Sequence, residues 1–357
     1  MRRVAAILGP TASGKTALAV ALRERGLPIE VICCDASQMV AGVDAATAKP
    51  TAAERAAVPH HLVDAWPLDR PLSAGRYVEL ALPAIDDVVA RGAWPVLVGG
   101  TGLYHRALTE GLAPIPPIPT SVRAGLALEA EQRGLAALWA ELQAADPTYA
   151  AGTPPENRQR VLRALEVLRH TGRPFSAWHA TPTQGVVQSC DLVLQPDRAR
   201  WDRALAVRAE AMVAPLWAEA ARLRSAGVPA DAPGLAALGY RDAYALLEQH
   251  AGTDIIPEDA RATLRERLLR SHRAYAKRQR TWFAKLPNAL GLDPFADDTV
   301  ERAAAAVRAV FTEAAAVRES RDRETAPVAT LTEEQGIGPQ REGDVLHLLP
   351  RVRTQQE

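Results

Sequence analysis

Residues 9–16 read Gly-Pro-Thr-Ala-Ser-Gly-Lys-Thr, and they stand between an apolar run at 4–8 and a helix-forming run at 17–22. A strand, a glycine-rich loop and a helix in this order are typical of a phosphate-binding loop, or P-loop. Its backbone N–H groups surround phosphate oxygens, and the helix N-terminus adds partial positive charge. Lys15 supplies a mobile cation, and the Thr16 hydroxyl can ligate Mg²⁺. The residues predicted to bind a diphosphate or triphosphate are Gly9, Pro10, Thr11, Ala12, Ser13, Gly14, Lys15 and Thr16.

The composition is ordinary for a globular protein, with 48% hydrophobic and 24% charged residues in a chain of 357. No apolar run reaches the length of a membrane span. Cys33, Cys34 and Cys190 contain no C-x-x-C pair, so neither a zinc site nor a disulfide framework is indicated. These features predict a cytoplasmic protein that has no membrane partner.

The alternation of short apolar runs with longer helical patterns predicts an α/β fold with a parallel sheet. Strands are expected at 4–8, 29–34, 95–98 and 190–195. A proline-rich hinge at 114–119 opens a long helical stretch. We therefore expect a P-loop nucleoside-triphosphatase-like catalytic core of residues 1–115 and 186–320, with a helical insertion domain at 116–185. The composition of 321–357 predicts a disordered tail.

Two polar elements follow expected strands and would meet the P-loop at one edge of the sheet. Asp35 ends the second strand, where a carboxylate can act as a general base, hold a metal or simply cap a turn. Gly99-Gly100-Thr101-Gly102 ends the third, and Thr101 would present a hydroxyl to the same crevice. The third strand does not end in aspartate and the chain has no Asn-Lys-x-Asp run, which argues against a motor ATPase and a GTPase.

A strongly basic segment lies at 261–285, where nine basic side chains face one acidic side chain in a chain of zero formal net charge. Leu264, Leu268, Tyr275 and Trp282 are expected to share one face of a helix, with the cations on the others. The pattern fits either a solvated helix or a contact with a polyanion.

Further stretches follow the P-loop in a fixed order that ends near residue 285. They are Asp35 with Gln38, 47–50 (Thr-Ala-Lys-Pro), 60–64 (His-His-Leu-Val-Asp), 98–104 with 110–111 (Glu-Gly), 160–167 (Arg-Val-Leu-Arg-Ala-Leu-Glu-Val), 171–174 (Thr-Gly-Arg-Pro), 238–241 (Leu-Gly-Tyr-Arg), 275–279 (Tyr-Ala-Lys-Arg-Gln) and 281–283 (Thr-Trp-Phe). Taken together and in this order, they resemble the tRNA dimethylallyltransferases (isopentenyl-tRNA transferases) of bacterial type.

The resemblance implies transfer of a dimethylallyl group from dimethylallyl diphosphate to N6 of the adenine at position 37, next to the tRNA anticodon, with release of pyrophosphate. It implies a catalytic set in which Asp35 is the base, Thr101 positions the adenine and Arg208 helps to bind pyrophosphate. It also implies Mg²⁺ as cofactor, with Thr16 as its protein ligand, in a monomer whose partners are dimethylallyl diphosphate and the anticodon stem-loop of tRNA. The implied tRNA contacts are Asp35, Ala36, Ser37, Gln38, Thr101, Arg123, Gln159, Arg160, Val161, Leu162, Arg163, Lys277, Arg278, Gln279 and Arg280.

Two other functions fit parts of the sequence. A P-loop small-molecule kinase would also place an aspartate after the second strand, and Arg160 with Arg163 could form its lid. Transfer of labelled phosphate from ATP would identify such an enzyme. An RNA-binding P-loop module without this chemistry would explain the basic segment, but it would leave Asp35 and Thr101 without a role.

Overall fold

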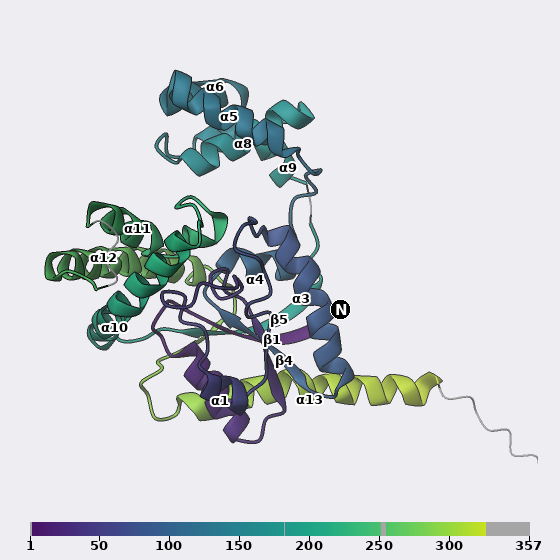
Figure 1. Ribbon diagram of the computed structural model, residues 1–357. Helices are drawn as coiled ribbons and strands as arrows, with labels where there is room; N and C mark the ends of the chain where they lie inside the picture. Colours follow the sequence, from purple (N-terminus) through teal and green to yellow (C-terminus); the bar gives the residue numbers. More distant parts are fainter. Residues whose placement is uncertain (1, 182, 251–254, 326–357) are drawn as a thin grey trace, which may run out of the picture. The chain divides into compact units, whose positions relative to one another are not determined.

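A parallel sheet of six strands organises the fold in this computed structural model, which describes residues 2–181, 183–250 and 255–325, with side chains up to residue 312 (Figure 1). The strand order is β3-β2-β4-β1-β5-β6, and every neighbouring pair is parallel. The strands are β1 (Arg2–Leu8), β2 (Ile29–Cys33), β3 (His60–His61), β4 (Trp94–Gly99), β5 (Val187–Leu194) and β6 (Leu290–Leu292). The α/β fold with a parallel sheet is thus confirmed, while the short edge strands β3 and β6 lie outside the expected set.

Helices cover both faces of this sheet, because successive side chains of β1 point in opposite directions. Val4 and Leu8 pack with α3 (Ala74–Ala90) and α4 (Gly102–Thr109). Ala5 and Ile7 pack with α1 (Lys15–Glu24) and with the first part of α13 (Thr299–Thr325). A short helix, α2 (Ala52–Ala57), precedes β3. Strands buried on both faces read as continuous apolar runs, which is why the sequence reveals the inner strands.

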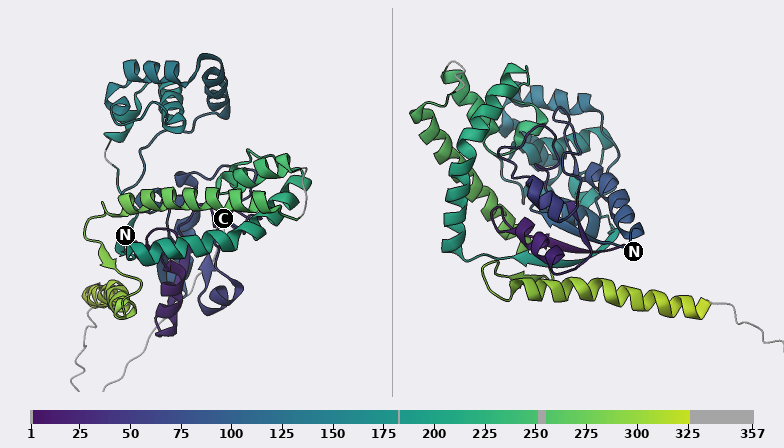
Figure 2. Two further views of the ribbon diagram at one scale, coloured as in Figure 1. Left: turned by 90° about the vertical axis from the view of Figure 1, so that its left-hand side faces the viewer. Right: turned by 60° about the horizontal axis from the view of Figure 1, so that its bottom comes forward.

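A second core is built by α10 (Arg198–Ser225), α11 (Tyr240–Gln249) and α12 (Glu258–Phe283), together with the 3₁₀ helix η1 (Pro233–Ala236). The long helices α10 and α12 lie side by side (Figure 2). The buried face of α12 includes Leu264 and Leu268, as expected, but it continues through His272, Ala276, Gln279 and Phe283. Tyr275 and Trp282 are half-buried, and Trp282 packs against the core on the α3 and α4 face of the sheet.

The expected helical insertion contains five helices that pack around an apolar cluster of their own. Leu138, Leu142 and Leu165 are fully buried there. The helices are α5 (Thr120–Arg133), α6 (Leu135–Ala145), α7 (Pro147–Ala150), α8 (Arg158–Thr171) and α9 (Phe175–His179). The domain limits of 116 and 185 stay a prediction.

The C-terminal helix α13 extends further than expected, to Thr325. Residues 321–325 are therefore helical where a disordered tail is predicted, and 326–357, the rest of that tail, lie outside the described residues. Within the described part of the chain, none of the helices has the length and apolar character needed to cross a membrane.

Candidate active site

The P-loop connects β1 to α1 and, with Thr11 to Thr16, lines a cavity of about 620 Å³. Gly14 caps α1 with φ of +82°, a left-handed conformation that favours glycine. Lys15 Nζ donates to the carbonyl oxygens of Gly9 at 3.2 Å and Pro10 at 2.8 Å, so the amine folds back over its own loop. Burial lowers the pKa of Lys15 to about 8, because desolvation disfavours the charged amine. An anion in the cavity would reverse this effect.

Two side chains from distant helices hold the P-loop in place. Trp201 Nε1, on α10, donates to the Thr11 carbonyl at 2.9 Å. Gln279, on α12, accepts from the Thr11 N–H at 2.8 Å and donates to the Gly100 carbonyl at 2.9 Å. This side chain is only 4% exposed and joins the two glycine-rich loops through its amide. The structure thus places Gln279 inside the site, and its implied RNA contact stays a prediction.

Other parts of the chain approach the backbone of the Gly99–Gly102 segment closely, namely Cys34 at Gly99 and α12 at Gly100 and Gly102. A Cβ at Gly100 would lie 2.1 Å from Gln279 Nε2, and one at Gly102 would lie 2.1 Å from Trp282 Nε1. Between them, the Thr101 hydroxyl accepts the Ala36 N–H at 3.0 Å. It also interacts with the Tyr275 hydroxyl. Tyr275 is one of the cavity-lining residues, whereas Thr101 is not among them.

Asp35 and Arg208 both line the cavity beside the P-loop lysine. Asp35 Oδ1 accepts from the Ser37 N–H at 3.1 Å and from its hydroxyl at 2.7 Å. The carboxylate charge favours the protonated forms of Lys15 and Arg208, whereas burial lowers the pKa of the Arg208 guanidinium. Arg208 Nε is buried and has no hydrogen-bond partner among the described residues. A buried donor of this kind needs an acceptor, and a phosphate oxygen would provide one.

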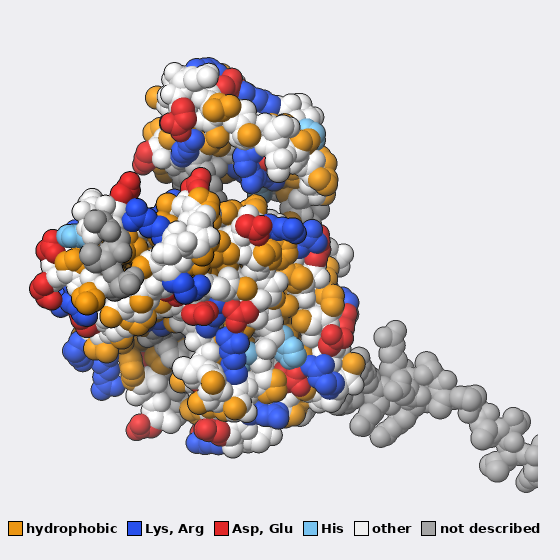
Figure 3. Space-filling model, in the orientation of Figure 1, with side chains coloured by type: hydrophobic (Ala, Val, Ile, Leu, Met, Phe, Trp, Pro, Cys, Tyr) orange, Lys and Arg blue, Asp and Glu red, His pale blue; other side chains and the backbone are white. Residues whose placement is uncertain are grey.

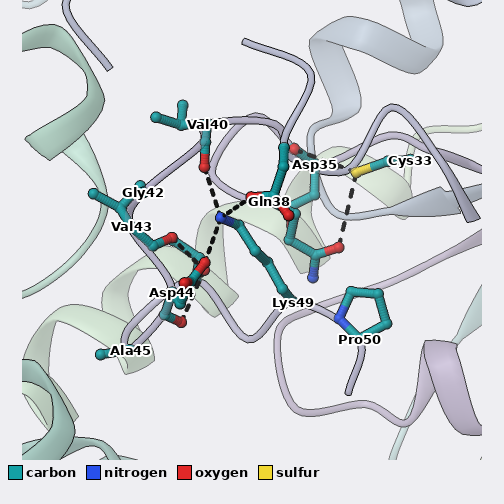
Figure 4. A network of polar contacts seen from close by, with 12 residues as sticks. Cys33, Asp35, Gln38, Val40, Gly42, Val43, Asp44, Ala45, Lys49 and Pro50 are labelled. Carbon is teal, nitrogen blue, oxygen red and sulfur yellow. Dashed lines mark hydrogen bonds and ion pairs between the residues drawn. The ribbon is translucent and has the colours of Figure 1, made fainter. Parts of the chain in front are cut away.

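The loop that follows Asp35 is held closed by Lys49 (Figure 4). Only 5% of the Lys49 side chain is exposed, and its amine donates to the Val40 carbonyl at 2.7 Å and to Asp44 Oδ1 at 2.6 Å. It also forms an ion pair with Asp64, which comes shortly after β3. In the sequence, Lys49 is notable only as part of the family resemblance. In the structure, its contacts hold one wall of the cavity in place.

Apolar side chains line a further part of the same cavity. Val40 and Ala46 come from the loop that Lys49 closes, and Leu72 precedes α3. Ala237 and Leu238 follow η1 on the side of the helical bundle. One cavity therefore offers cationic donors, a carboxylate and a hydrocarbon surface. It can hold a short apolar group that is covalently attached to a diphosphate.

The implied RNA contacts near Asp35 share the cavity with it. Ala36, Ser37 and Gln38 all line its wall. The Gln38 amide nitrogen donates to the Ala48 carbonyl at 2.8 Å, so this side chain also helps to close the loop.

In the helical insertion, two of the implied RNA contacts share one carboxylate. Arg123 Nη2 and Arg163 Nη1 lie 3.2 Å and 3.1 Å from the carboxylate oxygens of Glu166. Glu166 is only 5% exposed at its side chain, whereas the two arginines reach the surface. The buried carboxylate therefore orients both guanidinium groups while leaving donors free for phosphate.

The first residues of α8 are also implied RNA contacts, and some of them are exposed while others are buried. Gln159 and Arg160 are exposed, and Leu162 is half-buried. Val161 is fully buried in the cluster of the insertion, and its implied RNA contact stays a prediction. Its place follows from the helical period, because Ala164 and Leu165 lie on the same face.

The basic segment carries less uncompensated charge than its sequence indicates. Acidic partners from α10, α11 and α12 itself form ion pairs with the cations of its first half, and red and blue side chains are interspersed over these helices in Figure 3. The pairs are Arg261 and Arg265 with Glu210, Arg267 with Asp242, Arg270 with Glu266, and Arg273 with Asp202.

Four cations near the end of α12 have no acidic partner among the described residues; they are Lys277, Arg278, Arg280 and Lys285. The guanidinium of Arg278 lies 5.6 Å from the ring centre of Tyr275, and that of Arg280 lies 5.5 Å from Trp201. Arg278 also lines the cavity. Of these four cations, Arg278 therefore brings positive charge without an acidic partner to the cavity wall.

Comparison with known proteins places this geometry among enzymes that act on tRNA. Residues 38–286 match the family described as IPP transferase. The tRNA dimethylallyltransferase of Thiobacillus denitrificans is 44% identical over 307 residues, which cover 85% of this chain and 95% of the relative. That of Salinispora arenicola is 41% identical over 308 residues, or 86% of each chain. The crystal structure of the tRNA isopentenylpyrophosphate transferase from Bacillus halodurans aligns with a TM-score of 0.62 at 32% identity, over 89% of this chain and all of that one.

Proposed function

We propose, since the chain belongs to the IPP transferase family, that it transfers a dimethylallyl group from dimethylallyl diphosphate to N6 of adenine 37 in tRNA. The observation that carries this proposal is the single cavity that joins Lys15, Arg208 and Asp35 to an apolar wall. A diphosphate with a short hydrocarbon tail matches both surfaces.

The donor diphosphate would bind to the P-loop. Backbone N–H groups of the loop, the Lys15 amine and the unpaired Arg208 Nε would donate to its oxygens. Negative charge grows on these oxygens as the bond from carbon to oxygen breaks, so the same donors stabilise the transition state more than the ground state.

The acceptor amine would approach Asp35. A bond forms between N6 and the prenyl carbon, the bond from that carbon to the diphosphate oxygen breaks, and pyrophosphate leaves with the electron pair. The proton from N6 passes to the Asp35 carboxylate, whose Oδ1 is oriented by Ser37. Because the base is normally stacked in the anticodon loop, it must be flipped out to reach this position.

Mg²⁺ would enter with the diphosphate. The described residues contain no cluster of three or more His, Cys, Asp or Glu side chains that could hold a metal alone. Thr16, the last residue of the P-loop, lines the cavity. One protein oxygen together with phosphate oxygens and water is a usual Mg²⁺ environment. When bound, the ion would neutralise charge on the departing pyrophosphate.

Recognition of the anticodon stem-loop would rely on the exposed cations. Arg278 lines the cavity, Lys277 and Arg280 are exposed on the same helix, and Arg123 with Arg160 would add contacts from the insertion. The monomeric state and the cytoplasmic location stay predictions of the sequence.

Product analysis distinguishes this proposal from a kinase. The enzyme is incubated with dimethylallyl diphosphate, Mg²⁺ and an anticodon stem-loop, and pyrophosphate release is measured with each component left out in turn. We expect release only when donor and RNA are both present. Formation of ADP from ATP in step with turnover, and no release from the prenyl donor, would instead favour the kinase.

A further inference from the structure

A buried histidine lines the cavity and has no role in the mechanism above. His272, on α12, is only 2% exposed and is one of the lining residues. Its Nδ1 lies 2.8 Å from the Leu268 carbonyl oxygen. Because a carbonyl can only accept, Nδ1 carries a hydrogen and the neutral ring keeps its lone pair on Nε2. None of the hydrogen bonds in the described part of the chain involves Nε2.

The groups around this ring come from every side of the cavity. Arg208 faces it from α10, and burial together with this cation lowers the pKa of His272 below its ordinary value. Lys15 and Asp35 line the same space from the P-loop and from the end of β2, and Arg278 and Tyr275 line it from α12. The segment between β2 and α3 adds three charged lining residues, Lys49, Glu54 and Arg70. Helix α11 contributes no lining residue. Without an anion, a third cation here would add to the repulsion between Lys15 and Arg208.

We propose that His272 is a proton-accepting member of the diphosphate site: Nε2 takes up one proton from solvent when diphosphate binds and then donates it as a hydrogen bond to a phosphate oxygen. This inference rests on the proposed donor site. A bound polyanion within a few ångströms favours the imidazolium, just as it favours the charged forms of Lys15 and Arg208. The free site thereby avoids an unpaired buried charge, and the occupied site gains a further charge-assisted hydrogen bond.

The sign of the effect follows from linkage. Binding raises the pKa of His272, so affinity is greatest at pH values below the pKa of the free ring and is lost as the pH rises through the pKa of the bound ring. Between these two values, pyrophosphate affinity should fall by up to about tenfold for each pH unit. The window lies below the region where Lys15 loses its proton.

Calorimetric titration with inorganic pyrophosphate tests this proposal. Binding is measured between about pH 6 and pH 7.5 in buffers of different ionisation enthalpy, which gives the number of protons taken up. The wild type is compared with His272→Gln. The matched control is His60→Gln, since His60 also bonds a backbone carbonyl through Nδ1 and has a lowered pKa, but does not line the cavity. Protonation of pyrophosphate itself is common to all three proteins and cancels in the comparison.

We expect the wild type and His60→Gln to take up as much as one proton more per site than His272→Gln, with a correspondingly steeper pH dependence. Equal uptake in all three proteins, with binding retained, would overturn the role of His272 alone. No binding of pyrophosphate to the wild type would refute the donor site itself and this inference with it. If His272→Gln does not fold, the imidazole resonances of the wild type are titrated by NMR with and without pyrophosphate. An unchanged His272 pKa would then reject the proposal.

Discussion

Replacement of Asp35 by asparagine removes its function as a general base and keeps its ability to accept hydrogen bonds. The amide oxygen of the new side chain can still accept from Ser37, so the loop should keep its shape. Loss of a general base typically lowers the rate by 10²–10⁴-fold, which corresponds to about 2.7–5.5 kcal/mol of transition-state stabilisation. Pyrophosphate affinity should stay the same or rise, because the variant removes a negative charge that shares the cavity with Lys15 and Arg208.

Single-turnover transfer of a labelled prenyl group to an anticodon stem-loop measures this rate, with calorimetry for pyrophosphate and filter binding for RNA. Asp87→Asn, an exposed substitution on α3, is the matched control and should be silent. A transfer rate near that of the wild type would refute the assignment of Asp35 as base. A loss of pyrophosphate affinity that accounts for the loss of rate would instead make Asp35 a ligand of the donor complex.

The same contacts allow three further predictions. Because the pKa of Lys15 is about 8, pyrophosphate affinity should fall as the pH rises through that value, and Lys15→Arg should flatten the profile; a profile identical to that of the wild type would contradict this. Lys277→Ala and Arg280→Ala should each reduce the slope of log affinity for the stem-loop against log salt by about 0.7–0.9. Arg270→Ala, which loses only a surface ion pair with Glu266, is the control and should leave the slope unchanged. Slopes equal to that of the wild type in all variants would exclude an RNA contact at Lys277 and Arg280. Lys49→Met should lower the free energy of unfolding in urea by about 2 kcal/mol, because buried hydrogen bonds to a charged group are lost, and an unchanged value would show that the loop closes without it.

The part of the site that depends on local chain order could be predicted from the sequence. A buried strand, a glycine-rich loop and a helix place Lys15 and Thr16 without knowledge of any distant residue, and the end of β2 places Asp35 in the same way. The inner strands were predictable because both faces of the sheet are covered. Strands β3 and β6 were missed because segments of two and three residues are too short to show a period.

The part that depends on long-range packing could not be predicted. Polar residues of a helix usually face solvent, yet His272 and Gln279 of α12 are both buried. Gln279 bonds Thr11 across 268 positions of sequence, and no local pattern reports such a contact. The charge of 261–285 was overestimated for the same reason, since Glu210 and Asp202 belong to another helix.

Mass spectrometry of tRNA nucleosides tests the proposed prenyl transfer most directly. Unmodified tRNA is incubated with the full chain, dimethylallyl diphosphate and Mg²⁺, then digested and compared with a reaction that contains Asp35→Asn. We expect that one adenosine, at position 37, gains the mass of a single five-carbon prenyl unit at N6 in the wild-type reaction, and that the variant leaves it almost unmodified. An unchanged nucleoside profile with the wild type, or a prenyl group on a different base, would contradict the proposed function.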